Sequence, residues 1–175
     1  MPYSAPSTIT TGQLVTASLM NTEWAGNIAF LANPPACRVF NNAAIALTSG
    51  LLTALTFNSE RYDTNTMHDT ATNSGRITFN TAGLYTIIGH ASFAANGTGY
   101  RQLAIRMNGA TFLASFNPIN NGAGQNTDVL IATTYKFAVA DYVELLAQQT
   151  SGGALNITSN GNYSPEFLAT WVGFG

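Results

Sequence analysis

Hydrophobic residues in the first part of the chain recur at helical spacing. Between residues 17 and 32, four apolar side chains fall within roughly 80° on a wheel of 3.6 residues per turn. These four residues, called the apolar stripe below, are Met20, Trp24, Ile28 and Leu31. Thr16 can cap the first turn, and Pro34 and Pro35 stop the helix and stiffen the exit. The pattern predicts a helix over residues 17–32.

An isolated helix of this length is marginally stable in water, because nucleation is costly and few backbone hydrogen bonds follow it. Gly26 weakens the helix further, since glycine loses more conformational freedom on folding than any other residue. We therefore expect the apolar stripe to dock on the same subunit, on a neighbouring subunit or on a larger assembly. Residues 1–35 are interpreted as an N-terminal arm and short helical anchor.

After Pro35 the pattern changes to short segments in which apolar and polar residues alternate, separated by glycine and asparagine. A tight hairpin is indicated at Asn108-Gly109. Strands are predicted over residues 38–40, 43–47, 52–57, 76–80, 83–94, 100–108, 111–117, 127–138, 142–149, 154–158 and 165–174. About ten antiparallel strands in one segment are typical of a sandwich. We expect an all-β head over residues 36–175, an antiparallel jelly-roll β-sandwich.

The composition supports an all-β head and adds an expectation about assembly. Charged residues make up 8% of the 175 residues, against about 25% in an average globular protein. Polar surface must come instead from neutral residues, of which the chain has 23 Thr and 18 Asn. Because so little charge keeps copies apart, we expect one flank of the sandwich to be buried in a symmetric oligomer.

Aromatic residues point to the same conclusion. Eight lie in predicted strands, and adjacent aromatic positions on both faces of a strand cannot all fit one small core. They are Tyr85, Phe93, Tyr135, Phe137, Tyr142, Phe167, Trp171 and Phe174. We assign Tyr85, Tyr142, Trp171 and Phe174 to the core or a subunit interface, and expect Tyr85 and Trp171 to be mostly buried. The alternative is that all eight line the core.

Several partner classes are disfavoured by charge and hydropathy. The net charge is −2, and no window holds the basic patch that nucleic-acid binding needs. No apolar segment approaches the ~20 residues needed to insert into a membrane. The first residues lack a secretion signal, so we expect synthesis in the cytoplasm. The single cysteine, Cys37, is interpreted as a small buried apolar residue, because it cannot form an internal disulfide.

Catalytic machinery is not visible in the sequence. His90 lies in an apolar strand, where we expect a core or interface residue rather than a base. The acidic residues Glu60, Glu144 and Glu166 lie in separate segments, and each is interpreted as an exposed charge at a strand end. The glycines at 122 and 124 are not followed by the Lys, Ser and helix of a phosphate loop. We expect no enzymatic activity and no cofactor.

A metal site in the loop over residues 64–74 is the remaining candidate. Asp63, His68 and Asp69 could in principle hold a divalent ion, but their spacing matches no known ligand set. We favour a solvated loop at these residues over a metal site.

Two motifs of the head stand at a recognisable spacing: Asn58, Tyr62 and Asp63 precede a predicted strand, and a Gly-x-Tyr strand start follows at residues 83–85. They resemble the globular head of complement component 1q, a tumour-necrosis-factor-like jelly roll, which carries both motifs. Residues 139–145 resemble its Gly-Asp-x-Val turn, with Ala140 in place of the glycine, and residues 167–174 resemble its last strand. The resemblance covers about residues 36–175.

The N-terminal segment carries a second resemblance. Residues 11–22, with Gly12, Val15-Thr16-Ala17 and Met20-Asn21, look like the opening of small structural proteins of tailed bacteriophages. The two resemblances imply a homotrimer displayed on a virion: a minor tail protein, fibre head or capsid decoration. Residues 1–35 would then attach the chain to other capsid or tail proteins, and the jelly roll would face outward.

Recognition of the host is the alternative function. A receptor-binding tip would bind a host-surface glycan or protein through loops, because Asn and Thr side chains pair well with sugar hydroxyls. The loops over residues 63–74 and 117–127 are the candidates.

Overall fold

The computed structural model describes residues 7–175 and divides the chain into two compact units at Pro35. In the first unit the predicted helix over residues 17–32 is confirmed, as three consecutive segments. They are α1 (Ala17–Met20), the π-helical η1 (Asn21–Gly26) and α2 (Asn27–Ala32). The Thr16 hydroxyl accepts a hydrogen bond from the backbone N–H of Leu19 at 3.2 Å, so Thr16 caps the helix as its chemistry predicts.

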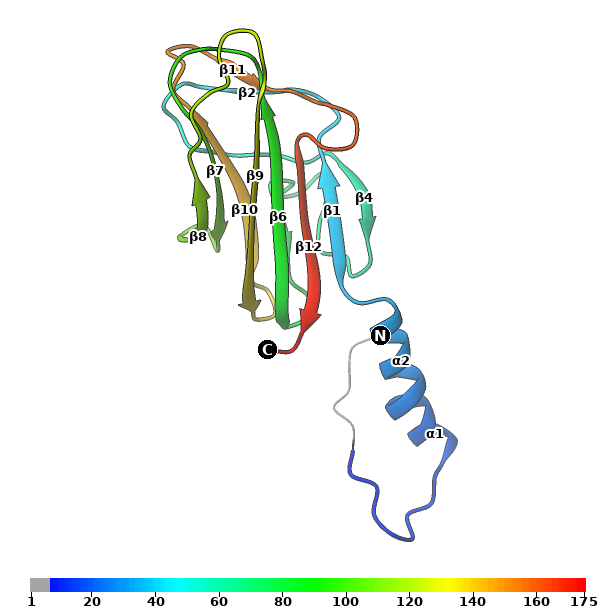
Figure 1. Cartoon of the computed structure of the whole chain (residues 1–175). Coiled ribbons are helices and arrows are strands. Elements are labelled where there is room, and N and C mark those ends of the chain that lie inside the picture. The colour runs from blue at the N-terminus through cyan, green and yellow to red at the C-terminus, as the bar shows by residue number, and fades with distance from the viewer. Residues whose placement is uncertain (1–6) are drawn as a thin grey trace. The chain divides into compact units, whose positions relative to one another are not determined.

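The second unit, residues 36–175, is an antiparallel sandwich of two sheets (Figure 1). The seven-stranded sheet has the order β2 (Ile45–Leu47), β11 (Leu155–Ile157), β6 (Gly83–Phe93), β12 (Glu166–Gly173), β1 (Ala36–Phe40) and β4 (Ser59–Asp63), with β9 (Thr127–Phe137) also paired to β6. The five-stranded sheet has the order β3 (Thr53–Ala54), β10 (Tyr142–Gln149), β7 (Arg101–Met107) and β8 (Thr111–Phe116), with β5 (Arg76–Thr78) also paired to β10. The expected all-β jelly-roll class is therefore confirmed.

Strand β6 shows how the alternating pattern builds the core. Its odd-numbered residues from Gly83 to Ala91 are buried between the sheets, and its even-numbered residues from Leu84 to His90 are half-buried on the outer face. The buried Tyr85 packs in an aromatic group with Phe79 at 4.5 Å and Phe137 at 6.1 Å between ring centroids. Cys37 is fully buried in β1, as predicted, and burial raises the pKa of its thiol.

Two features of the head differ from the expectation. Strand β4 was not predicted, because its sequence Ser59–Asp63 has no apolar alternation. It is the edge strand next to β1, its one partner among the strands of the described chain. The strand predicted over residues 52–57 is reduced to Thr53–Ala54, since Leu55 and Phe57 make backbone hydrogen bonds outside a regular ladder.

The two sheets approach closely where Gly89 of β6 faces Leu145 of β10. A Cβ atom added at Gly89 would lie 2.4 Å from Cδ1 of Leu145, which is itself fully buried. Leu145 fills the space that a side chain at position 89 would need.

We predict that Gly89→Ala destabilises the head by about 1–3 kcal/mol, because overpacking forces Leu145 or the backbone to shift. Denaturant unfolding measures the loss. Gly124→Ala is the matched control, since a Cβ there meets no atom within 4 Å, and it should stay within about 0.5 kcal/mol of the wild type. Equal stability of the two variants would contradict the packing argument.

Candidate functional site

The apolar stripe of the N-terminal unit is largely open to solvent. Trp24, Ile28 and Leu31 are 58%, 63% and 63% exposed, whereas Met20 is half-buried. The helix buries a different set of residues, Gly26, Asn27 and Phe30. Three large apolar side chains on one exposed helix face indicate a contact surface.

The outer face of the seven-stranded sheet carries an apolar hollow of about 350 Å³. Its apolar lining comes from three neighbouring strands: Ile88 of β6, Leu168 of β12 and Leu130 of β9, the last 60% exposed. Its polar rim consists of Arg38, His90, Tyr163 and Glu166. His90 therefore lies on the outer face, half-buried, with its ring packed edge-on against Tyr163 at 5.4 Å between centroids.

A buried carboxylate lies at the rim of this hollow. Glu166 is only 4% exposed and accepts hydrogen bonds from two guanidinium groups, those of Arg38 on β1 and Arg61 on β4. The Arg61 contacts to Glu166 are 3.0 and 2.7 Å. The expectation of an exposed charge at the strand end is wrong for Glu166, because β1 and β4 bring two arginines over the start of β12. Glu144 is likewise partly buried and pairs with Arg106 at 2.9 Å.

A second apolar surface lies on the flank of the sandwich formed by strands β8 and β9. Strands β8 and β9 lie side by side as the outermost strands of their two sheets (Figure 1). The exposed apolar residues on and next to them, called the open edge below, are Phe112, Phe116, Ile119 and Tyr135, which are 53%, 52%, 81% and 40% exposed. Large apolar side chains at such exposure mark an interaction surface.

The aromatic residues assigned to the core or an interface divide into two groups. Tyr85 is fully buried and Trp171 is 9% exposed. Tyr142 is half-buried, and Phe174 is 42% exposed while its ring packs against Trp171 at 4.8 Å. The partial exposure of Tyr142 and Phe174 leaves the subunit-interface assignment open for these two.

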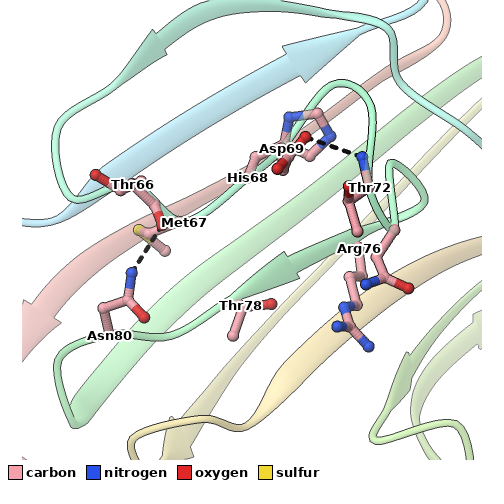
Figure 2. Close-up of a pocket in the computed structure, with 9 residues that line it drawn as sticks. Thr66, Met67, His68, Asp69, Thr72, Arg76, Thr78 and Asn80 are labelled. Carbon is pink, nitrogen blue, oxygen red and sulfur yellow. Dashed lines mark hydrogen bonds between the residues drawn. The ribbon is translucent and has the colours of Figure 1, made fainter.

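A third surface feature, called the polar pocket below, is a cavity of about 310 Å³ between the 66–73 loop and strand β5 (Figure 2). The carboxylate of Asp63 shapes this loop by accepting hydrogen bonds from the backbone N–H groups of Asn65, Met67 and His68. The Met67 carbonyl in turn accepts from the backbone N–H of Thr78 at 2.7 Å.

The solvated-loop interpretation is wrong for His68. Its side chain is fully buried, with Nδ1 at 3.0 Å from Glu60 and Nε2 at 3.2 Å from the Ser74 carbonyl oxygen. Asp69 does lie at the exposed rim, where the backbone N–H groups of Thr72 and Ala71 lower the pKa of its carboxyl group. Asp63, His68 and Asp69 thus bind different partners, and within residues 7–175 no group of three His, Cys, Asp or Glu side chains is arranged to hold a metal.

No helix in the part of the chain that the structure describes is long and apolar enough to span a membrane.

Three solved structures resemble the head. The globular domain of zebrafish complement 1qA protein has a TM-score of 0.57 and 19% sequence identity, and the match covers 81% of this chain and 98% of that one. Eiger TNF from S. frugiperda has a TM-score of 0.58 and 9% identity, with 81% of this chain and 95% of that one covered. Murine APRIL has a TM-score of 0.58 and 8% identity, with 79% of this chain and 98% of that one covered. No protein-family model and no curated protein sequence matches the chain. These similarities show that the chain has a complement-1q/TNF-like jelly-roll fold.

We predict that Glu166→Gln lowers the free energy of unfolding by about 1–3 kcal/mol, because two guanidinium groups lose the carboxylate that they share. Thermal and denaturant unfolding measure the change. Asp128→Asn removes the same charge from an exposed position on β9, and it should stay within about 0.5 kcal/mol of the wild type. A Glu166→Gln protein as stable as Asp128→Asn would show that the arginine pair contributes nothing.

Proposed function

We propose that this chain, whose head has the jelly-roll fold of complement 1q and TNF domains, is a non-enzymatic structural protein of a tailed-phage virion. In this proposal three copies form a surface knob, as a minor tail protein, fibre head or capsid decoration. Residues 1–35 attach the knob to other virion proteins. Separate observations support the assembly of three copies, the attachment through residues 1–35 and the absence of enzymatic activity.

The assembly of three copies is supported by the presence of two different apolar surfaces on one head. The apolar hollow lies on the outer face of the sheet, and the open edge lies on the flank formed by β8 and β9. A contact between the open edge of one copy and the hollow of the next joins unlike surfaces, and such contacts close into a ring when the rotation between copies fits. A closed ring of three covers both surfaces on every copy.

The chemistry of the two surfaces suits this contact. The apolar hollow has a volume of about 350 Å³, which is at the lower end of the range for small-molecule pockets. This volume accommodates an aromatic side chain. The open edge offers Phe112 and Phe116, both more than half exposed. With a net charge of −2 on each chain, little electrostatic repulsion opposes the association.

Attachment is supported by the exposed stripe on the helix. Trp24, Ile28 and Leu31 form an apolar face that gains free energy when it is covered. Residues 11–22 resemble the start of phage structural proteins, which supports a virion as the place where the helix docks.

The absence of enzymatic activity is supported by the contacts that three glutamate side chains of the head form with arginine and histidine. Glu166 binds two arginines, Glu144 binds Arg106, and Glu60 contacts His68. These three carboxylates already have partners within the head.

A second candidate function, recognition of a host-surface glycan or protein, is favoured by the polar pocket.

We predict that light scattering on the purified protein gives the mass of three chains. Leu130→Asp places a charge in the apolar hollow and should yield folded monomers, as judged by an unchanged far-UV spectrum. Leu51→Asp is the control, because Leu51 is 56% exposed outside both surfaces and its replacement should leave the trimer intact. A wild-type protein that is monomeric at micromolar concentration would remove the assembly proposal.

We predict that Trp24→Ala reduces the amount of protein in purified particles while the head stays folded, because the stripe loses its largest side chain. Quantitative mass spectrometry of particles measures incorporation. Leu14→Ala is the matched control, since Leu14 is 80% exposed and lies outside the stripe. Normal incorporation of Trp24→Ala would place the attachment elsewhere.

A further inference from the structure

The polar pocket contains two charged side chains, Arg76 and Asp69, that form no ion pair among the residues the structure describes. Arg76 lies on β5 with its guanidinium carbon 4.7 Å from the centre of the Tyr142 ring. Its cross-strand neighbour on β10 is Glu144, but that carboxylate pairs with Arg106. Within residues 7–175, the Arg76 guanidinium makes no ion pair and no hydrogen bond. Its N–H donors are therefore available to a ligand in the pocket.

The rest of the lining consists mainly of neutral hydrogen-bonding groups. Figure 2 shows Arg76, Thr78 and Asn80 on one side of the polar pocket, with Thr66 and Asp69 of the loop on the other. Asn80 donates through Nδ2 to the carbonyl oxygens of Asn65 and Thr66, at 2.9 and 2.7 Å, which leaves its Oδ1 as an acceptor. The hydroxyl groups of Thr72 and Thr78 can each donate and accept. Such a lining matches a ligand that carries several hydroxyl groups.

The walls of the pocket are held in place without a ligand. Asp63 holds the loop through three hydrogen bonds from backbone N–H groups. The His68 ring contacts Glu60 through Nδ1 and the Ser74 carbonyl oxygen through Nε2. Thr66 and Asn73 adopt positive φ values of 51° and 55°, which the loop maintains at a cost in free energy. A rigid site loses little conformational entropy on binding, so modest contacts give measurable affinity.

We propose that the polar pocket binds a saccharide unit that bears a carboxylate, such as a uronic acid. The guanidinium fork of Arg76 matches a carboxylate in two parallel hydrogen bonds. The hydroxyl groups of Thr72 and Thr78 and the oxygen of Asn80 bind the hydroxyl groups of the sugar. A volume of about 310 Å³ accommodates one sugar ring and excludes a large apolar ligand.

This inference deepens the second candidate function and does not rest on the trimer. The residues of the polar pocket belong neither to the apolar hollow nor to the open edge. Loss of sugar binding therefore leaves the assembly proposal untouched, and a monomeric protein can still bind the sugar. The two proposals fail separately.

The methionines of the chain provide a direct readout. Met67 is buried at the polar pocket, whereas Met107 lies beside a different cavity and Met20 belongs to the N-terminal helix. With the methionine methyl groups labelled with ¹³C, the full chain is titrated separately with D-glucuronate, D-galacturonate and N-acetylneuraminate. We expect the Met67 methyl resonance to shift saturably with at least one of these acids, and the Met107 resonance to stay in place. D-Glucose or D-galactose, the neutral counterparts, should bind about tenfold more weakly.

Arg76→Gln separates recognition of the carboxylate from recognition of the sugar. It should weaken acid binding about tenfold while binding of the neutral sugar changes less than about threefold. Lys136→Gln removes the same charge at a site outside the pocket and should have no effect. Thr78→Val keeps the shape of the side chain and should weaken acidic and neutral sugars alike. An unchanged Met67 resonance in each unliganded variant verifies folding.

Two results would overturn the inference. One is a Met67 resonance that none of the three acids shifts up to about 50 mM, which excludes even millimolar affinity. The other is equal binding of acidic and neutral sugars together with no effect of Arg76→Gln, which would show that the carboxylate is not recognised.

Discussion

The contact between the inner faces of the two sheets is the constraint on which the rest of the head depends. Gly89 lets Leu145 cross the space between the sheets, and near the other end of β6, where Phe137 pairs with Gly83, the rings of Phe79 and Phe137 stack at 4.0 Å between centroids. Because successive residues of a strand point to opposite faces, burying one face fixes which side chains lie on the other. The residues of the apolar hollow are therefore positioned by the same packing that forms the core.

Charge is rare in this chain, and the structure concentrates it in a few contacts. Glu166 joins the start of β12 to β1 and β4 through Arg38 and Arg61, so one carboxylate connects three neighbouring strands. Arg101 is buried, has no carboxylate partner among residues 7–175, and donates instead to the carbonyl oxygens of Asn96, Thr98 and Tyr100. Burial lowers the pKa of Arg101. Both groups hold edges and loops of the head in place.

The surfaces of the molecule are chemically distinct. The apolar hollow and the open edge suit contacts with further copies of the chain, and the apolar stripe suits a partner outside the head. The polar pocket combines hydroxyl groups with the cation of Arg76 and suits a small hydrophilic ligand. In the proposed knob, assembly uses the apolar surfaces and recognition uses the polar pocket, so a change in one leaves the other intact.

The helix over residues 17–32, the longer strands such as β6 and β9, and the burial of Cys37 were predictable, because each follows from periodicity or apolarity along a local stretch. Strand β4 was missed because its pairing with β1 supplies what its own pattern lacks. The sequence alone therefore determined the class of fold and the apolar character of the stripe. Only the tertiary structure decided the burial of Glu166 and His68 and the pairing of Glu144 with Arg106 rather than with its cross-strand neighbour Arg76. These features depend on partners from distant segments that no local pattern specifies.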